Sequence, residues 1–346
     1  MNRPQVIVVG AGIMGAWTAH ALAKAGASVT VIDATGAPGR GVSAESFGWI
    51  NSLHALPGTE EHARRQSGLK LWRRWAKSRP DLACVDMCGA LFWAESPGAS
   101  QALAKARAAA GEPVQIVEGD ALSRYAPGLT GPFGPQLAMF SAHDLAVDLP
   151  LACAALIDEA RAAGAELRSQ VSAHALLSED DRVCGVDTSA GQLRADAVVL
   201  ATGAAFSLSP HLAGGSDAPR AAVSPAIIVR ASLARPHRLA HAILQGPGIE
   251  IRQPADLTLL LARNLQSGMT EAEHATAAAD AIGAHFPQAG GLATIWAREV
   301  ARPLTPSWVP PEGVHLAIAH PGAILAPLVA EEIVARILPS DAADRP

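Results

Sequence analysis

The stretch VIVVGAGIMGAWTAHALAKAGASVTVID, residues 6–33, decides the fold. It begins with the apolar, β-branched run Val6–Val9, which is typical of a buried parallel strand, and it ends with a second such run that finishes on Asp33. Between these runs, the glycine-rich turn 10–15 is followed by an alanine-rich segment, 16–25, that predicts a helix. Strand, glycine turn, helix and strand in this order predict a Rossmann-like βαβ unit in an α/β protein.

The spacing of the turn, GAGIMG, gives each of its glycines a physical role. Gly10 permits the tight turn, Gly12 lets a pyrophosphate approach the backbone, and Gly15 lets the helix pack closely on the strand. The amides at the start of the helix then face the phosphates with the positive end of the helix dipole. Asp33 follows Gly15 by 18 residues and is placed to accept hydrogen bonds from a ribose. The combination predicts dinucleotide binding rather than a plain βαβ turn, and the turn by itself does not separate NAD from FAD.

Length and composition bound the remaining possibilities. The chain has 346 residues, 49% of them hydrophobic, which is enough for a large core and predicts two domains. Its formal net charge is −5 and its 27 lysines and arginines form no concentrated basic run, so we expect no nucleic-acid partner. We also expect a cytoplasmic protein, because no run of 18 apolar residues indicates a membrane span and the first strand starts too early for a signal peptide. An oligomer stays possible.

The cysteines give no indication of a metal site. They lie at positions 84, 88, 153 and 184, and although the first two are four apart, no second Cys/His pair at zinc spacing accompanies them. We therefore expect ordinary thiols and no bound metal.

Further along the chain, a second buried strand and a different kind of sheet are expected. The strand Ala197–Ala201 ends in a turn of small residues, 202–204, and ligands of open parallel sheets collect at such strand ends. From 222 to 261, three or four strand-like runs alternate with proline and glycine and predict an antiparallel sheet. A terminal helix is expected over 324–338.

Four separated stretches resemble the FAD-dependent D-amino-acid oxidase/glycine oxidase family, to which sarcosine oxidases and amino-acid dehydrogenases also belong. They are GAGIMG with Asp33, SFGWIN at 46–51, VVLATGA at 198–204, and RPLTP with AHPGAILAP at 302–327. The four occur in the order expected for the family and span nearly the whole chain. The resemblance implies a Rossmann-like FAD-binding domain and a glycine oxidase-like substrate domain with an antiparallel sheet. Their expected bounds are 1–80, 145–220 and 300–346 for the FAD-binding domain, and 81–144 and 221–299 for the substrate domain.

The resemblance also implies which residues contact FAD. By position, it implies that Gly10, Gly12, Gly15 and Asp33 hold the ADP half of FAD, and that Ser43 and Ser46 lie along the pyrophosphate and the flavin. It also implies that the backbone of Val171 contacts the adenine and that Gly203 lies near the phosphates. Backbone amides near the pyrimidine edge of the flavin ring, where negative charge develops on reduction, come from Gly322, Ala323 and Ile324. No cysteine lies near the C-terminal motif, so we expect the FAD to be bound non-covalently.

The same resemblance places Arg302 where family members bind the carboxylate of the substrate. A guanidinium can hold a carboxylate through two hydrogen bonds, and the alternative for Arg302 is a structural ion pair. Arg298 is a rival, because residues four apart share a face of an extended strand. His54 follows SFGWIN and is a second candidate for the substrate pocket, the alternative being a packing or solvent-facing histidine. Trp49 and Trp296 either wall the pocket or pack in the core.

The expected function is therefore that of an FAD enzyme. The substrate would be an amino acid or a related amine, its α-carbon would give a hydride to flavin N5, and the resulting imine would hydrolyse. Sarcosine oxidases use a lysine close to the flavin for the reaction with oxygen, whereas this chain has no lysine after Lys105, so the electron acceptor stays open between O₂ and a quinone-type molecule. Two alternatives are a non-catalytic or electron-relaying flavoprotein subunit of a larger complex and an NAD-dependent dehydrogenase.

Overall fold

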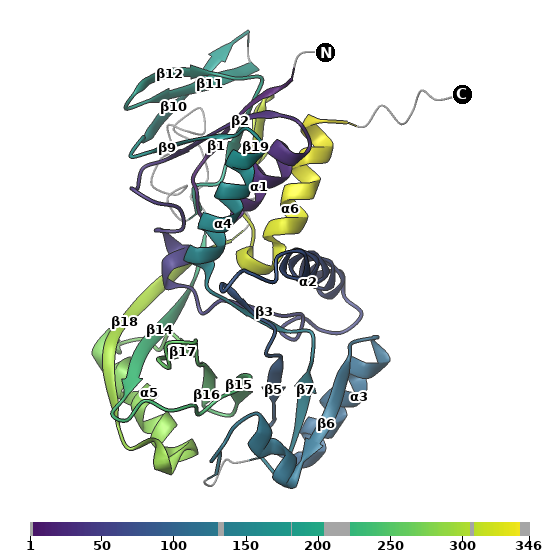
Figure 1. Ribbon diagram of the computed structural model, residues 1–346, viewed down its shortest axis with the longest axis vertical. Coiled ribbons are helices and arrows are strands. Elements are labelled where there is room, and N and C mark those ends of the chain that lie inside the picture. Colours follow the sequence, from purple (N-terminus) through teal and green to yellow (C-terminus); the bar gives the residue numbers. More distant parts are fainter. Residues whose placement is uncertain (1–2, 131–134, 181, 204–221, 305–307, 340–346) are drawn as a thin grey trace.

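The computed structural model describes residues 3–130, 135–180, 182–203, 222–304 and 308–339. The chain forms two sheet-based parts, one above the other in Figure 1. The upper part contains both chain ends, and the lower part contains the strands that lie within residues 90–141 and 223–303.

The upper part is built on a five-stranded parallel sheet. In spatial order its strands are β19 (Val314–Leu316), β13 (Ala197–Leu200), β1 (Gln5–Val9), β2 (Ser28–Asp33) and β9 (Glu166–Ser169). β1 lies in the middle, with Val8 opposite Val31 on one side and opposite Val199 on the other. Four of its five side chains are buried, because both faces of the sheet are covered, and this explains the uninterrupted apolar run in the sequence.

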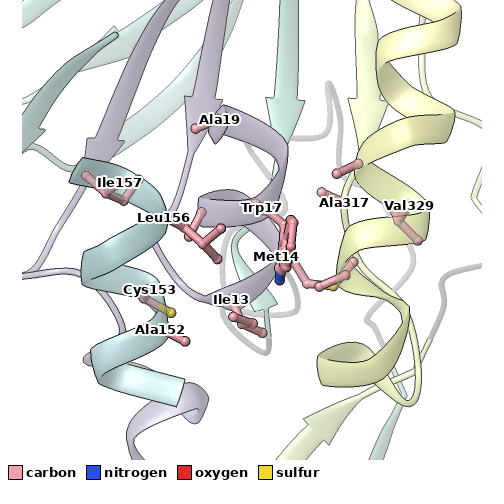
Figure 2. Packing of buried hydrophobic residues seen from close by; sticks show 14 of the residues in the cluster. Ile13, Met14, Trp17, Ala19, Ala152, Cys153, Leu156, Ile157, Ala317 and Val329 are labelled. Atoms are coloured by element: carbon pink, nitrogen blue, oxygen red, sulfur yellow. The ribbon is translucent and has the colours of Figure 1, made fainter. Parts of the chain in front are cut away.

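Helices cover one face of this sheet and a small antiparallel sheet covers the other. α1 (Ile13–Lys24) lies between α4 (Leu149–Ala162) and α6 (Gly322–Ile337), and α2 (Glu60–Ser78) packs against α6 (Figures 1 and 2). The small sheet consists of β10 (Ala173–Glu179), β11 (Arg182–Thr188) and β12 (Gly191–Arg194). Alternate residues of the central strands face the two covers: Val6 and Val8 pack in the helical core, and Ile7 and Val9 pack with the small sheet.

The helical core around α1 allows a direct test of packing. Figure 2 shows Leu156 of α4 in the space beside α1, and this leucine is fully buried. Leu156→Ala is expected to lower the free energy of unfolding by about 2–5 kcal/mol, because the lost methyl groups leave a cavity that the surrounding helices only partly fill. Leu151→Ala on the same helix is the matched control, since Leu151 is 54% exposed. Urea unfolding at a fixed FAD concentration measures both, and equal midpoints for the two variants would contradict this description of the core.

The lower part is an eight-stranded sheet. In spatial order its strands are β18 (Leu292–Pro303), β14 (Val223–Leu233), β17 (Leu259–Asn264), β16 (Ile249–Arg252), β15 (Ile243–Gly246), β5 (Ala90–Phe92), β7 (Leu137–Ser141) and β6 (Val114–Glu118). Neighbouring strands are antiparallel except for β15 and β5, which are parallel. α3 (Pro97–Ala109) packs on β6 and β7, and α5 (Glu271–His285) packs on β18 and β14.

A third sheet of short strands lies between the two parts. It consists of β3 (Trp49–Ile50), β8 (Leu145–Val147) and β4 (Val85–Asp86), with β8 in the middle. β3 belongs to the SFGWIN stretch, so the pairing of β3 with β8 holds this stretch at the junction of the two larger sheets.

The fold class predicted from the sequence is confirmed: a Rossmann-like parallel sheet is joined to a mostly antiparallel one. The predicted residue bounds of two domains stay a prediction. Within the described residues, no helix has both the length and the apolar character needed to cross a membrane.

Candidate active site

A cavity of about 1060 Å³ lies where the upper and lower parts meet. One side is lined by residues at the carboxyl ends of β1, β2 and β13 and at the first turns of α1 and α6. The other side is lined by residues of the eight-stranded sheet, from β14 to β18. Small-molecule pockets usually have volumes of about 300–1,000 Å³. This cavity therefore has room for a ligand of dinucleotide size together with a small substrate.

The three glycines of the turn have different surroundings. Gly10 has a φ of +105°, and a Cβ there would lie 2.6 Å from the carbonyl oxygen of Ala201. A Cβ on Gly15 would clash with the carbonyl oxygen of Gly10, and Gly15 does not line the cavity, so it serves the contact between helix and strand and does not itself hold the ADP half. Gly12 has an ordinary φ of −70°, and its Cβ would meet only Ser43 Oγ, at 3.4 Å. Gly12 lines the cavity, so the space that a side chain at this position would fill is available to a ligand.

The start of α1 presents backbone donors to the cavity. Ser43 Oγ accepts a hydrogen bond from the amide of Ile13 at 3.1 Å and thereby caps the helix from a distant loop. The amides of Gly12 and Met14, which also line the cavity, have no acceptor among the described residues. Unpaired amides at a helix N-terminus bind anionic groups such as phosphates.

Asp33 reaches the cavity from the end of β2. Its Oδ2 accepts from the amide of Ala11 at 2.6 Å, and its Oδ1 accepts from the amide and the hydroxyl of Thr35, at 2.7 and 2.6 Å. An ionised carboxylate has about four acceptor positions, so one is left for a ribose hydroxyl. Asp33 therefore also braces the glycine turn, a role that the spacing of the sequence does not indicate.

The remaining predicted cofactor residues line the same cavity. Ser46, Val171 and Gly203 lie along it, and the amide of Val171 is already used in a bond to the carbonyl of Asp33, which leaves the Val171 carbonyl for a ligand. Beside Gly203, the buried hydroxyl of Thr202 has no hydrogen-bond partner within the described ranges. Ala204, Thr305 and Pro306, which end two of the motifs, lie outside the described residues.

The first turn of α6 closes the cavity with Gly322, Ala323 and Ile324. Pro327 lies inside this helix and has no N–H to bind the carbonyl four residues earlier, that of Ala323. The indole Nε1 of Trp72 donates to this carbonyl instead, at 2.8 Å. Trp72, on α2, thus lets the helix begin at Gly322, and the amides of its first turn face the cavity.

Taken together, this half of the cavity fits FAD. The N-termini of α1 and α6 both border the cavity, and a helix N-terminus favours anionic groups such as phosphates. Asp33 has one free acceptor position, and the buried hydroxyl of Thr202 has no partner among the described residues.

At the other end of the cavity, Arg302 lies on β18 and is held by strand β14. Its Nε donates to the carbonyl of Ser224 at 3.0 Å, and its Nη2 donates to Ser224 Oγ at 3.0 Å and to the carbonyl of Pro225 at 3.3 Å. Nη1 has no partner in the part of the chain that the structure describes. The guanidinium is thus fixed in orientation and keeps one nitrogen for an anionic ligand.

Arg298 does not share this position, although it is on the same strand. Its Nη1 pairs with Glu45 Oε1 at 2.5 Å, its guanidinium carbon lies 5.5 Å from the ring centre of Trp296, and neither Arg298 nor Trp296 lines the cavity. The prediction that Arg298 could reach the same pocket is therefore wrong: Arg298 pairs with Glu45, which lines the cavity, but Arg298 itself does not line it. Trp49, in contrast, does line the cavity.

His54 lines the cavity and is held by its neighbours. Its Nε2 lies 3.1 Å from Oε1 of Gln245, and its ring packs edge-on against Trp49 with 4.7 Å between ring centres. Burial lowers the pKa of His54, and the positive charges of nearby arginines lower it further, so the ring is neutral at neutral pH. A neutral imidazole in this setting can donate or accept one hydrogen bond toward a substrate.

A buried charged cluster holds the loop that carries His54. Glu112 accepts from Ser52 Oγ at 2.6 Å, from His62 Nε2 at 2.8 Å and from Arg107 Nη1 at 2.9 Å. Arg107 also donates to the carbonyls of Ser52 and Leu53. Burial acts to raise the pKa of Glu112, but the three hydrogen bonds outweigh it and lower the pKa, so the carboxylate is charged. The loop before His54 is therefore fixed by groups that come from α2 and α3.

Several cavity residues have no signal in the sequence. Gln245 on β15, Glu250 on β16 and Arg65 on α2 all line the cavity. In an alternating strand, a polar residue is expected to face solvent, and sequence alone cannot show that this face borders a cavity. With Glu250 and the arginines Arg65 and Arg302, the cavity is lined by charged residues of both signs.

The parallel sheet with its glycine turn, and the cavity at its strand ends, are those of a dinucleotide-binding protein. The sequence profile of the DAO family, described as FAD dependent oxidoreductase, matches residues 5–336. The chain belongs to this family, as the four motifs predict.

Curated relatives share part of their length with this chain. A glycine oxidase of Pseudomonas aeruginosa is 30% identical over 209 residues, which cover 58% of this chain and 55% of the relative. D-amino acid dehydrogenase 2 of Ralstonia nicotianae is 28% identical over 257 residues, covering 58% of this chain and 60% of the relative. The chain thus matches little more than half the length of either relative.

Solved structures match over nearly the whole chain. The glycine oxidase of Geobacillus kaustophilus has a TM-score of 0.77 at 20% identity and covers 97% of this chain and 95% of its own. The L-proline dehydrogenase of P. horikoshii has a TM-score of 0.81 at 19% identity, with 97% and 94% covered. At these identities the likeness establishes the shared fold.

Proposed function

We propose that the protein oxidises the Cα–N bond of an amino acid or a related amine with FAD as the oxidant. The observation that carries the proposal is that one cavity is lined both by the glycine turn with Asp33 and, from the eight-stranded sheet, by the fixed guanidinium of Arg302. When bound, FAD supplies a hydride acceptor, and the resulting imine hydrolyses in water.

The chain's own residues position the reactants. The amides at the start of α1 and Asp33 would hold the ADP half, and the first turn of α6 would lie at the flavin ring, where its amides favour negative charge. Arg302 would bind the carboxylate of the substrate through Nη1, and His54 would contact the substrate between Trp49 and Gln245. Fixing the α-carbon in this way lowers the entropic part of the barrier.

Anaerobic mixing with amino acids tests the proposal. Bleaching of the flavin absorbance by an amino acid supports catalysis, and the alternative, a non-catalytic or electron-relaying subunit of a larger complex, predicts that no amino acid or amine bleaches it. A colourless protein that binds NAD would contradict the choice of FAD.

We also propose that the FAD is bound non-covalently. None of the four cysteines, all of which lie in the described part of the chain, lines the cavity. Precipitation with acid is expected to release the flavin into the supernatant, where its absorbance measures it. Flavin that stays in the precipitated protein would contradict this expectation.

The proposed electron acceptor is O₂ or a quinone-type molecule. None of the four lysines of the chain lines the cavity, whose basic side chains among the described residues are arginines and two histidines. Comparing reoxidation by O₂ and by a quinone in a stopped-flow instrument decides between the two acceptors.

A further inference from the structure

Glu250 is a cavity residue whose carboxyl group has no ion-pair partner among the described residues. It lies on β16 between Ile249 and Ile251, which are buried on the opposite face of the sheet. Its one hydrogen bond within the described ranges is a long one, 3.4 Å from Gln245 Nε2 to Glu250 Oε2, and no ion pair involving Glu250 occurs there. A carboxylate that is removed from water needs a cation or hydrogen-bond donors. The cavity therefore offers a place for a cationic group with several N–H donors.

Arg302 gives the same region a matching positive group. It lines the cavity from β18, and its charge acts on Glu250, but the two do not form an ion pair. An acidic and a basic group that border the same space, each without an ion-pair partner among the described residues, are complementary to a zwitterion. An α-amino acid carries a carboxylate and an ammonium group on one carbon.

We propose that Glu250 binds the α-ammonium group of the substrate while Arg302 binds its carboxylate, and that Glu250 accepts the proton that the ammonium group loses before oxidation. This inference rests on the proposed function and narrows its substrate class to zwitterionic amino acids. It also supplies a base, which a neutral amine substrate would not require.

The reaction balances with this assignment. The zwitterion H₃N⁺–CHR–COO⁻ gives one proton to Glu250 and one hydride, with its electron pair, to FAD as oxidant. The product is the iminium H₂N⁺=CR–COO⁻, which water hydrolyses to the oxo acid and ammonium. Glu250 then returns its proton to solvent.

The assignment predicts a pH dependence. Burial raises the pKa of Glu250 to about 7, and the positive charge of Arg302 opposes this shift. The pKa values of His54 and His320, which border the same cavity, are lowered by burial, so both are neutral near pH 7; Arg65 and Arg263 also line the cavity. The carboxylate form is therefore populated as the pH rises through about 7. We expect the second-order rate of flavin reduction to rise over the same range.

Glu250→Gln tests the inference, with Glu299→Gln as the matched control. Glu299 is an exposed carboxylate on β18 outside the cavity, so its variant has the same change of charge. Dissociation constants are measured for glycine, D-alanine and D-lysine, and for acetate and propionate, which lack the amine. For ligands that do not reduce the flavin, the constants come from the change in the flavin spectrum on binding. For ligands that reduce it, they come from the dependence of the anaerobic reduction rate on ligand concentration.

The expected result is a selective loss. Glu250→Gln should bind glycine and D-alanine at least about tenfold more weakly, because a charge-assisted hydrogen bond is lost. Acetate and propionate should bind equally well or more tightly, because a negative charge has been removed. The rise of reduction rate near pH 7 should disappear in Glu250→Gln and persist in Glu299→Gln.

Other results would overturn the inference. Equal weakening of the amino acids and of the carboxylic acids would show a structural role, and weakening only of D-lysine would assign Glu250 to a substrate side chain. A wild-type protein that is reduced by amino acids, with Glu250→Gln behaving like Glu299→Gln, would contradict this inference alone. A wild-type flavoprotein that no amino acid reduces would contradict the proposed function, and the inference with it.

Discussion

Replacing Arg302 by alanine is expected to abolish most of the reduction of the flavin by amino acids while leaving the FAD bound. Arg302 lines the cavity from β18, on the eight-stranded sheet, and its Nη1 has no partner within the described residues. Loss of a partly desolvated guanidinium–carboxylate contact costs roughly 2–5 kcal/mol, which weakens binding by about 30-fold or more. The measurement is the rate of anaerobic flavin reduction as a function of substrate concentration, with the FAD content of each preparation.

Two further variants separate the role of Arg302 from general effects of charge. Arg298→Ala removes a guanidinium four residues earlier on the same strand, which pairs with Glu45 and does not itself line the cavity, and it should retain near wild-type reduction. Arg302→Lys should recover only part of the rate, because a single ammonium nitrogen cannot reproduce the planar guanidinium, whose Nε and Nη2 bind Ser224 while Nη1 is free for a carboxylate. Unchanged kinetics in Arg302→Ala would instead indicate an amine substrate without a carboxylate.

The nucleotide-binding half is predictable from sequence because its signals are local. Val6–Val9 must be buried on both faces, and the turn that follows needs glycine at fixed positions for steric reasons. These constraints act between residues that are close in the chain. Asp33 also accepts hydrogen bonds from the amides of Ala11 and Thr35. This second role depends on the conformation of the turn, so the spacing of the sequence does not reveal it.

The start of α6 shows how a distant residue changes a local prediction. The sequence predicts a helix from Ile324, because the His-Pro-Gly segment before it breaks regular structure and Pro327 favours a first helical turn. The helix begins two residues earlier, at Gly322, because Trp72 supplies the hydrogen bond that Pro327 cannot give. No local pattern reveals that a tryptophan 251 residues away is the donor.

The substrate end is less predictable for the same reason. Arg298 and Arg302 are equivalent by strand periodicity, and only the position of Glu45, in a loop of the other half, separates them. Glu250 has the alternating pattern of a solvent-facing residue, and it borders a cavity because the two sheets meet there. Side chains that face each other across a junction of sheets cannot be paired from one sequence.

Gly12→Val is expected to give a folded protein without FAD. Nothing in the part of the chain that the structure describes requires glycine at this position, since its φ is −70° and a Cβ would contact only Ser43 Oγ there, at 3.4 Å. The branched side chain would instead occupy the cavity where the phosphates are proposed to approach the amides of Gly12 and Met14. The variant should purify colourless, with a wild-type far-ultraviolet circular dichroism spectrum. Added FAD should not raise its melting temperature, whereas it should raise that of the wild-type apoprotein.

Two other glycines serve as controls because their surroundings differ from those of Gly12. Gly15→Ala should lower stability in the presence and absence of FAD, because a Cβ there clashes with the carbonyl of Gly10 inside the contact of α1 with β1. Gly98→Val, in the exposed first turn of α3, has open space around its Cβ and should retain both fold and flavin. Full FAD content in Gly12→Val would mean that the open side of Gly12 is not where the phosphates lie. A loss of stability in Gly12→Val like that of Gly15→Ala, with or without FAD, would mean that Gly12 serves packing and not ligand binding. The three variants together therefore distinguish a cofactor-binding glycine from a structural one.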